Sequence, residues 1–222
     1  MQKCDFSELV EVTRGPAVES IHLGAVAVVD AAGRLVAQAG NPQVVTYLRS
    51  SSKPIQALPF VEAGGLEAFG ITDRELALLC ASHSGTDEHV AVVRGIQQKI
   101  GVTEDRLLCG THRPYYTPTY EAMLLRGEPL SPNRHNCSGK HTGFLAYALL
   151  RGEPLDEYIA FDHPIQTTIL ETFAQMSGLP AGQIHTGIDG CSAPVFAVPL
   201  YNAAWAFARL ADPAALPELR AA

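Results

Sequence analysis

The sequence lacks the features of a secreted or membrane-bound protein. Its first 20 residues contain no basic stretch followed by an apolar one, and no apolar run approaches the ~20 residues that a membrane-spanning helix needs. Basic residues are also scarce, because 16 Lys and Arg stand against 23 Asp and Glu and give a net charge of −7. We therefore expect a cytoplasmic protein that binds neither a membrane nor a nucleic acid.

Cysteine is sparse and irregularly spaced. The odd number of five cysteines shows no repeated spacing: Cys4, Cys80, Cys109, Cys137 and Cys191. A disulfide framework is therefore not expected, and the thiols read as metal ligands or as members of the core. A chain of 222 residues with 47% hydrophobic content suffices for one large domain or two small ones.

The pattern of apolar residues predicts a mixed α/β chain. Residues 21–29 and 34–39 read as two strands joined by a turn at 30–33, and another strand is expected at 184–188. Residues 109–120, rich in proline, tyrosine and threonine, read as an ordered loop over a site or an interface. Helical spacing, with glycines as stop signals, predicts helices at 54–64 or 54–70, 73–79, 88–101, 139–150, 164–176 and 203–210.

Ser50 and Lys53 form a Ser-x-x-Lys pair after the first two expected strands. If they begin a helix they share a face, so the lysine amine can reach the serine hydroxyl. The amine accepts a proton only when neutral, which requires its pKa to fall by roughly three units, at about 4 kcal/mol, through burial or a neighbouring cation such as Arg49. Pro54 places a helix start or a tight entry turn here. The pair alone does not establish catalysis, because such serines also cap helices.

Three further segments combine glycine with hydroxyl, thiol or basic side chains, at 80–89, 135–143 and 187–194. Glycine at such points lets the backbone approach a ligand closely. In the first of them, Ser82 and Ser84 flank His83, but adjacent side chains of an extended strand do not face each other, so His83 is not expected to serve as their base. This segment reads as a helix-capping turn or, if Ser82 meets Ser50 in space, as part of a site.

The last two segments also permit a metal site. His135 and Cys137 share a face of an extended chain, whereas Cys137 and His141 share a face of a helix. Together with Cys191, two thiolates can hold Zn²⁺ with Lys140 or His141 nearby. The spacing matches no zinc finger, and the first glycine of a phosphate loop is absent, so spacing alone leaves open a metal site or ordinary buried cysteines.

The four segments together resemble the Rhizobium etli type L-asparaginase II family. They read Arg49-Ser-Ser-Ser-Lys53-Pro, Cys80-Ala-Ser-His-Ser-Gly-Thr-Asp-Glu-His89, His135-Asn-Cys-Ser-Gly-Lys-His-Thr-Gly143 and Gly187-Ile-Asp-Gly-Cys-Ser-Ala-Pro194. The resemblance implies a bacterial enzyme that hydrolyses L-asparagine to aspartate and ammonia. It also implies an α+β fold like that of serine β-lactamases and penicillin-binding proteins, with an antiparallel sheet flanked by helices, in a single domain over residues 1–222.

The same resemblance implies roles for nine residues. The catalytic groups, two from one Ser/Lys pair and the serine of a second pair, are Ser50, Lys53 and Ser82. The zinc ligands, which include an unusual neutral lysine, are Cys137, Lys140 and Cys191. The residues that line the substrate pocket, the last of them facing the α-ammonium group, are Arg49, His141 and Asp189.

Members of this family extend beyond residue 222, and the lysine of their second pair falls in that further part. We therefore expect the C-terminal part of the family domain to be missing here, which leaves the activity of the chain open. The expected mechanism is attack of Ser50 or Ser82 on the side-chain amide, with Lys53 relaying the proton and backbone amides stabilising the oxyanion. The alternatives are a related amide hydrolase such as a glutaminase, or a zinc-binding, catalytically silent fragment. Formation of a homodimer is also left open.

Overall fold

The computed structural model describes residues 5–212, 214 and 216. Cys4 lies outside these residues. The described chain combines helices with small antiparallel sheets, which confirms the mixed α/β class. It divides into two compact units. Among the described residues, no helix has both the length and the apolar character needed to cross a membrane.

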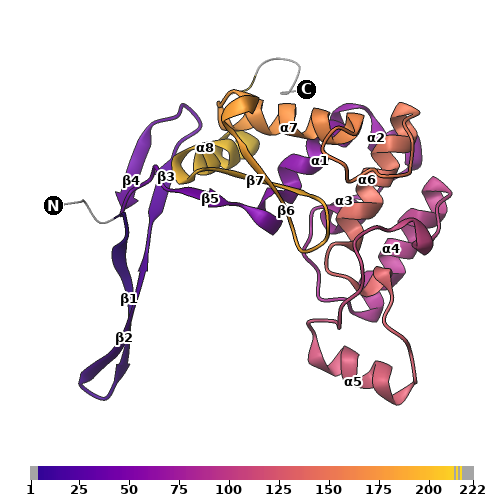
Figure 1. Cartoon of the computed structure of the whole chain (residues 1–222), viewed down its shortest axis with the longest axis horizontal. Coiled ribbons are helices and arrows are strands. Elements are labelled where there is room, and N and C mark those ends of the chain that lie inside the picture. The colour runs from indigo at the N-terminus through magenta and orange to yellow at the C-terminus, as the bar shows by residue number, and fades with distance from the viewer. Residues whose placement is uncertain (1–4, 213, 215, 217–222) are drawn as a thin grey trace. The chain divides into compact units, whose positions relative to one another are not determined.

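The first unit consists of the described residues of 1–48, 174–185 and 196–222. Its first five strands are β1 (Ser7–Arg14), β2 (Ala17–Gly24), β3 (Val26–Val29), β4 (Leu35–Ala39) and β5 (Val45–Tyr47). Strands β1 and β2 form a long, largely exposed antiparallel hairpin (Figure 1), and β3 pairs with β4 in a second one. The second hairpin is the predicted one, but the predicted strand 21–29 is in fact two strands that meet at Gly24 and Ala25.

Helix α8 (Leu200–Ala211) packs against β3 and the turn after it. The Tyr201 hydroxyl donates to the carbonyl oxygen of Gly33 over 2.6 Å, and the Trp205 indole N–H donates to that of Ala31 over 3.0 Å. Gly33 has φ +83°, in the left-handed region that glycine adopts without strain. The predicted turn at 30–33 and the predicted C-terminal helix are therefore both confirmed.

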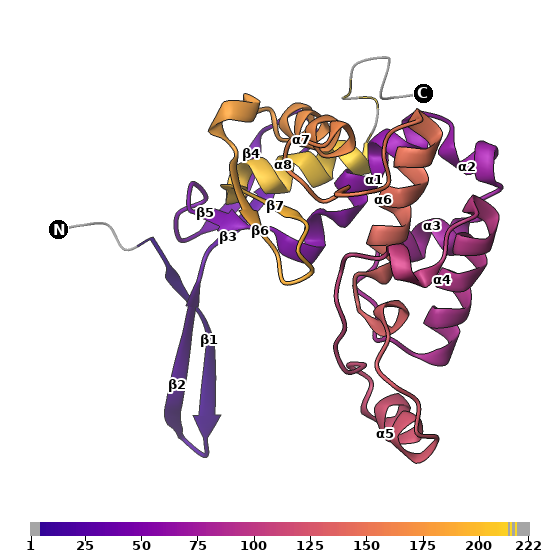
Figure 2. The same ribbon diagram turned by 45° about the vertical axis from the view of Figure 1, so that its right-hand side comes forward.

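The second unit consists of 49–173 and 186–195. Its helices, of which the last runs on into the first unit, are α1 (Lys53–Glu62), α2 (Gly65–Phe69), α3 (Asp73–Leu79), α4 (Asp87–Ile100), α5 (Thr117–Leu125), α6 (Ser138–Arg151) and α7 (Pro164–Ser177). Helix α6 packs against α1, α3 and α4 (Figure 2). Short 3₁₀ helices are η1 (Arg49–Ser52), η2 (Glu104–Arg106), η3 (Pro132–Arg134) and, in the first unit, η4 (Ala181–Gln183).

Local sequence explains most of these helices. Capping boxes open α3 and α4, where Thr72 pairs with Glu75 and Thr86 with His89. The predicted helix from residue 54 uses both of its glycine stops, because α1 ends before Gly64 and α2 continues to Gly70. Helices α3, α4, α6 and α7 agree with the predicted ranges to within one or two residues.

Strands β1, β5 and β7 (Pro194–Pro199) and helix α5 were not predicted. Helix α5 overlaps the expected loop 109–120, and its apolar residues gave no helical signal because they do not gather on one face, and only Met123 is buried. Strand β7 is buried along nearly its whole length, so it lacks the alternation of a half-buried strand. It pairs with β5 and lies next to β6 (His185–Ile188), the predicted strand, in a sheet of order β5-β7-β6.

Candidate active site

The four segments marked by the sequence meet within the second unit. Residues 49–53 form η1 and the start of α1, and residues 80–89 connect α3 with α4. Residues 135–143 lead into α6, and 187–194 join β6 to β7. Hydrogen bonds link all four segments to one another, so residues up to 140 positions apart in the chain share one site.

The two candidate serines lie side by side. Ser50 Oγ is 3.3 Å from Ser82 Oγ, which meets the condition under which the second segment was expected to join the site. Ser82 is exposed and Ser50 is half-buried, so a ligand from solvent can reach both hydroxyls. The side-chain amide of Asn136 also donates from Nδ2 to Ser82 Oγ over 2.7 Å.

His83 does not act on either neighbouring serine, as the sequence predicts. Its Nδ1 accepts a hydrogen bond from the main-chain N–H of Gly85 over 3.1 Å. Its Nε2 lies 2.8 Å from Ser138 Oγ, which itself donates to the carbonyl oxygen of Asn133. Nε2 therefore carries the proton, and the ring is neutral. Burial lowers the pKa of His83 to about 3, in agreement with these bonds.

Lys53 is only 2% exposed although it is a lysine. Its Nζ donates to the carbonyl oxygen of Ala81 over 2.6 Å and to that of Asn136 over 3.4 Å. Among the described residues, no hydrogen bond joins Lys53 Nζ to Ser50 Oγ. Burial lowers the pKa of Lys53, and the nearby Lys140 cation lowers it further, while the neighbouring Cys137 and Cys191 oppose this shift. The amine is thus placed in surroundings that favour its neutral form.

The turn that carries Ser50 is held by its own backbone and by a distant carboxylate. Arg49 has φ +49°, a left-handed conformation that is costly for a residue with a side chain, and the Ser52 hydroxyl fastens it by donating to the Arg49 carbonyl oxygen over 2.7 Å. Helix α1 then begins at Lys53, so the predicted tight entry turn is confirmed. Arg49 pairs with Asp189 and is not the cation with the largest effect on Lys53.

Arg49 and Asp189 form a half-open ion pair at the rim of the site. Arg49 Nη2 and Nε lie 2.8 and 3.0 Å from Asp189 Oδ1, which also accepts the main-chain N–H of Gly190. The Arg49 side chain is 67% exposed, whereas that of Asp189 is 10% exposed. Within the described residues, the second carboxylate oxygen, Oδ2, accepts no hydrogen bond. The pair therefore presents a largely exposed cationic group to a ligand, next to a carboxylate that is mostly buried.

Two thiols and a lysine converge in the buried part of the site. Cys137, Lys140 and Cys191 are each at most 4% exposed, and Lys140 Nζ donates to Cys191 Sγ over 3.0 Å. A hydrogen bond from the Cys137 thiol lowers the pKa of Cys191 and raises that of Cys137 itself. Cys191 is thus the sulfur that carries negative charge, and Lys140 stabilises it.

His141 lies under this cluster and is fully buried. The Tyr158 hydroxyl accepts the main-chain N–H of Leu108 over 2.8 Å and lies 2.7 Å from His141 Nδ1, to which it donates. The proton of a neutral His141 is therefore on Nε2, a buried atom without a hydrogen-bond partner of good geometry among the described residues. Burial lowers the pKa of His141 to about 4, and the Cys191 sulfur opposes this shift.

The donor chemistry of this cluster fits a soft metal ion. Two sulfurs and one amine nitrogen converge, and thiolates are preferred ligands of Zn²⁺. Among the described residues, no three His, Cys, Asp or Glu side chains form a metal-binding group by themselves. A metal set at this place would need Lys140 as its third donor, which the lysine can provide only after losing its proton.

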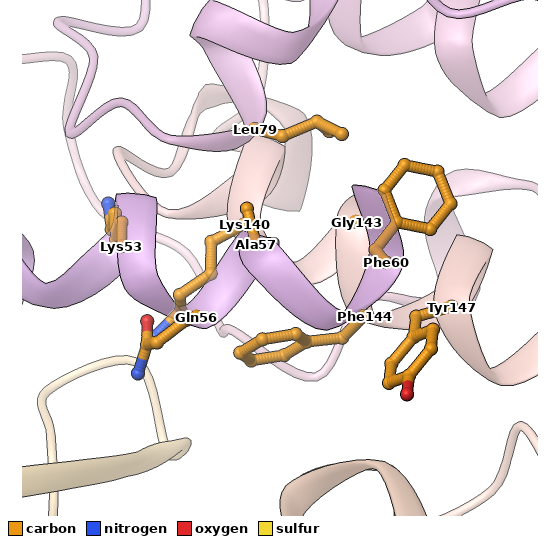
Figure 3. Close-up of a pocket in the computed structure, with 9 residues that line it drawn as sticks. All are labelled: Lys53, Gln56, Ala57, Phe60, Leu79, Lys140, Gly143, Phe144 and Tyr147. Atoms are coloured by element: carbon orange, nitrogen blue, oxygen red, sulfur yellow. The ribbon is translucent and has the colours of Figure 1, made fainter. Parts of the chain in front are cut away.

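A narrow pocket lies beside the two buried lysines, with a volume of about 10 Å³, roughly the space of one water. Figure 3 shows Lys53 at one end and the rings of Phe60 and Tyr147 at the other. Gln56 also lines it, and its Oε1 is a buried oxygen without a hydrogen-bond partner in the described part of the chain. The pocket is lined by both lysines and by apolar side chains, and it is too small for an amino acid.

Two residues of the site were not predicted to act in it. Asn136 belongs to the third marked segment, in which the sequence assigned roles only to other residues. His112 belongs to the loop that the sequence places over a site, and its Nε2 lies 3.0 Å from Asn136 Oδ1. The signal that could have found both is position alone: a polar residue inside a marked segment, and a histidine in a loop expected to cover it.

Comparison with known proteins gives one finding. Residues 10–222 match the model of the L-asparaginase II family. No curated protein matches the chain.

Proposed function

The chain belongs to the L-asparaginase II family, a family of amidohydrolases, and on that premise we propose that it hydrolyses the side-chain amide of L-asparagine to aspartate and ammonia. The observation that carries the proposal is the 3.3 Å approach of Ser50 Oγ to Ser82 Oγ at the exposed edge of a buried cluster of lysines and thiols. An activated serine nucleophile needs a base that can be neutral, and the desolvated amine of Lys53, three residues after Ser50, supplies the candidate.

The chemical step follows from these groups. One serine oxygen forms a bond to the amide carbon, the carbon–nitrogen bond breaks, and the serine proton passes through Lys53 to the departing nitrogen, which leaves as ammonia. Water then hydrolyses the aspartyl ester and restores the serine. Because Lys53 Nζ donates to Ala81 and Asn136, its contact with the serine requires a bridging water or a small shift of the amine.

Substrate recognition is assigned to the ion pair at the rim. Arg49 is cationic and largely exposed, which suits the α-carboxylate of an amino acid. Asp189 Oδ2, open among the described residues, suits the α-ammonium group. This division places the side-chain amide toward the serines. It does not by itself select asparagine over glutamine, whose side chain is one methylene longer, so glutamine hydrolysis is the second candidate.

The proposal includes a zinc ion held by Cys137, Lys140 and Cys191. Their convergence and burial support this set, as does the negative charge assigned to Cys191. A bound zinc ion would supply positive charge that orients the substrate carboxylate and lowers the pKa of Lys53. The proposal also includes the serine β-lactamase-like arrangement of sheet and helices implied by the motifs.

Ammonia release tests the proposal. The purified chain and the variants S50A, S82A and S50A/S82A are given L-asparagine or L-glutamine, and zinc content is measured on the same samples. We expect each serine variant to lose at least about 100-fold in kcat on L-asparagine. S84A, a change at the neighbouring serine, is the matched control and should retain activity. Full turnover by the double variant contradicts the proposal, and zinc binding without any turnover supports a silent fragment.

A further inference from the structure

We propose that Asn136, clamped by His112, is a positioning residue for Ser82. Asn136 Nδ2 donates to Ser82 Oγ over 2.7 Å, which is shorter than the 3.3 Å contact between the two serines. This inference rests on the proposed function, because it assigns Asn136 to the same serine site. Asn136 is not among the residues to which the sequence motifs or the proposed zinc site assign a role.

Asn136 is fixed in place from three directions. Its main-chain N–H donates to His112 Nε2 over 3.0 Å. Its carbonyl oxygen accepts the main-chain N–H of His83 over 3.2 Å and lies 3.4 Å from Lys53 Nζ. The residue is therefore tied to the loop of Ser82 and to the buried lysine at the same time, so its side chain starts from a rigid backbone.

His112 fixes the main chain of Asn136. Its Nδ1 lies 2.6 Å from the carbonyl oxygen of Arg113 and therefore carries the proton, so its Nε2 is the acceptor of the Asn136 main-chain N–H. The ring stacks on Tyr115 at 4.9 Å between centroids and touches the ring of His135 at 4.2 Å. Because contacts on its edges and its face hold the imidazole, the main chain of Asn136 stays in place, and its side-chain amide starts from a fixed point beside Ser82.

The hydrogen bond from Asn136 restricts the hydroxyl of Ser82, an exposed serine. A solvent-facing hydroxyl samples three staggered rotamers, and a fixed donor holds it in one of them. The same N–H stabilises negative charge on Ser82 Oγ as its proton leaves. Ser50 Oγ receives no such donor among the described residues, so the network singles out Ser82. Asn136 thus acts through Ser82 and need not touch the substrate.

Four variants test the assignment through kcat and KM for L-asparagine. N136A removes the amide, and N136D keeps its shape but replaces the donor by a carboxylate. We expect kcat to fall about 10- to 100-fold in both, with KM changed less than about threefold. H112F keeps the ring contacts but has no polar edge, so its kcat should fall about tenfold. H112Q returns a polar group near the position of Nε2, so its kcat should stay within about threefold of wild type.

A second measurement keeps this inference separate from the proposed function. Phenylmethanesulfonyl fluoride modifies an activated serine when its oxygen bonds to sulfur, fluoride leaves and the proton passes to solvent. Mass spectrometry of the Ser82 peptide gives the rate. We expect N136A and N136D to slow labelling about tenfold or more, and H112Q to label like wild type.

Labelling of the wild-type chain that slows in N136A, without any asparagine turnover, supports the positioning role while the proposed function fails. Wild-type kcat and wild-type labelling in N136A and N136D overturn the positioning role while the proposed function stands. A wild-type chain that neither turns over asparagine nor labels at Ser82 overturns both.

Discussion

The site has a buried half and an exposed half, and different interactions dominate in each. The buried half consists of Lys53, Cys137, Lys140 and Cys191, each at most 4% exposed. Charges there are poorly solvated, so each group's protonation state depends on its neighbours. Lys53 is pushed toward neutrality and Cys191 toward the thiolate, although both began with pKa values on the alkaline side of neutral.

The exposed half consists of Arg49, Ser50 and Ser82, which face solvent wholly or in part. Water screens charges at this surface, so electrostatic tuning is weak and position is set by hydrogen bonds. Ser82 is held by Asn136, and Arg49 is held by Asp189. The comparison teaches that the buried half controls proton affinity, whereas the exposed half controls geometry. Mutations in the two halves should therefore differ in what they change.

The largest effect is expected from removing the buried amine. K53M fills the space of the lysine stem but cannot accept a proton, so we expect kcat on L-asparagine to fall about 1,000-fold. The matched control is K99M, at a lysine outside the site whose amine likewise donates two hydrogen bonds, to the carbonyl oxygen of Gly70 and to Glu75. Activity of K53M within tenfold of wild type would remove Lys53 from the proposed mechanism.

The next effect concerns the metal. C191S removes the sulfur that carries negative charge, and we expect zinc affinity to fall at least about 100-fold, since even outer-shell changes cost 10- to 100-fold. Zinc content after dialysis against a competing chelator measures this. C109S is the control, because Cys109 is equally buried but its thiol donates to the carbonyl oxygens of Gly110 and Pro132 and is not one of the proposed ligands. Equal zinc retention in C191S and wild type rules out the proposed ligand set.

The pH dependence of stability separates buried from exposed histidines. The folded chain holds His83 neutral with a pKa of about 3, whereas the unfolded chain protonates it near 6.5. Between these values the unfolded state binds more protons, so the free energy of unfolding falls as the pH falls, by about 1.4 kcal/mol per unit. From about pH 6.5 to 5 this amounts to about 2 kcal/mol.

H83Q tests that contribution because glutamine does not titrate. Urea denaturation at about pH 6.5 and pH 5 measures the free energy of unfolding at each value. Its decrease between the two should be about 2 kcal/mol smaller for H83Q than for wild type. The control is H22Q, at an exposed histidine of β2, which should behave like wild type. If H83Q and wild type lose the same unfolding free energy between the two pH values, the burial of His83 does not control acid stability.

The smallest effect is expected at the rim. R49K keeps the charge but loses the planar fork that reaches Asp189 Oδ1 with two nitrogens. We expect KM for L-asparagine to rise about tenfold and kcat to change less than threefold, because Arg49 is assigned to binding and not to proton transfer. R94K, at an exposed arginine on α4, is the control. A fall in kcat at constant KM contradicts the division between the two halves.

The sequence predicted the fold where local signals were strong and failed where they were ambiguous. Helices α3 and α4 follow capping boxes, and α6 ends at Gly152 with φ +69°, so their limits are written in neighbouring residues. The hairpin β1–β2 was missed because its register shifts twice, between Glu8 and Val10 and between Val12 and Thr13, which breaks the alternation. Strand β7 was missed because burial on both faces removes alternation altogether.

The site divides in the same way. The motif residues Ser50, Ser82, Cys137, Lys140 and Cys191 could be marked from the sequence because unusual residue types gather around glycines, and the structure brings them together. Their individual roles stay predictions. The contact of Asn136 with a histidine 24 positions earlier could not be foreseen, because it exists only after the loops fold onto one another.

Mass spectrometry of the chain quenched during L-asparagine turnover tests the central claim most directly: an exposed serine attacks the amide and a buried lysine moves the proton. The account predicts an aspartyl ester on the peptide that carries Ser50 or Ser82, formed by the wild-type chain and absent from S50A/S82A. Steady ammonia release by the double variant, with no aspartyl group on either peptide, would contradict it.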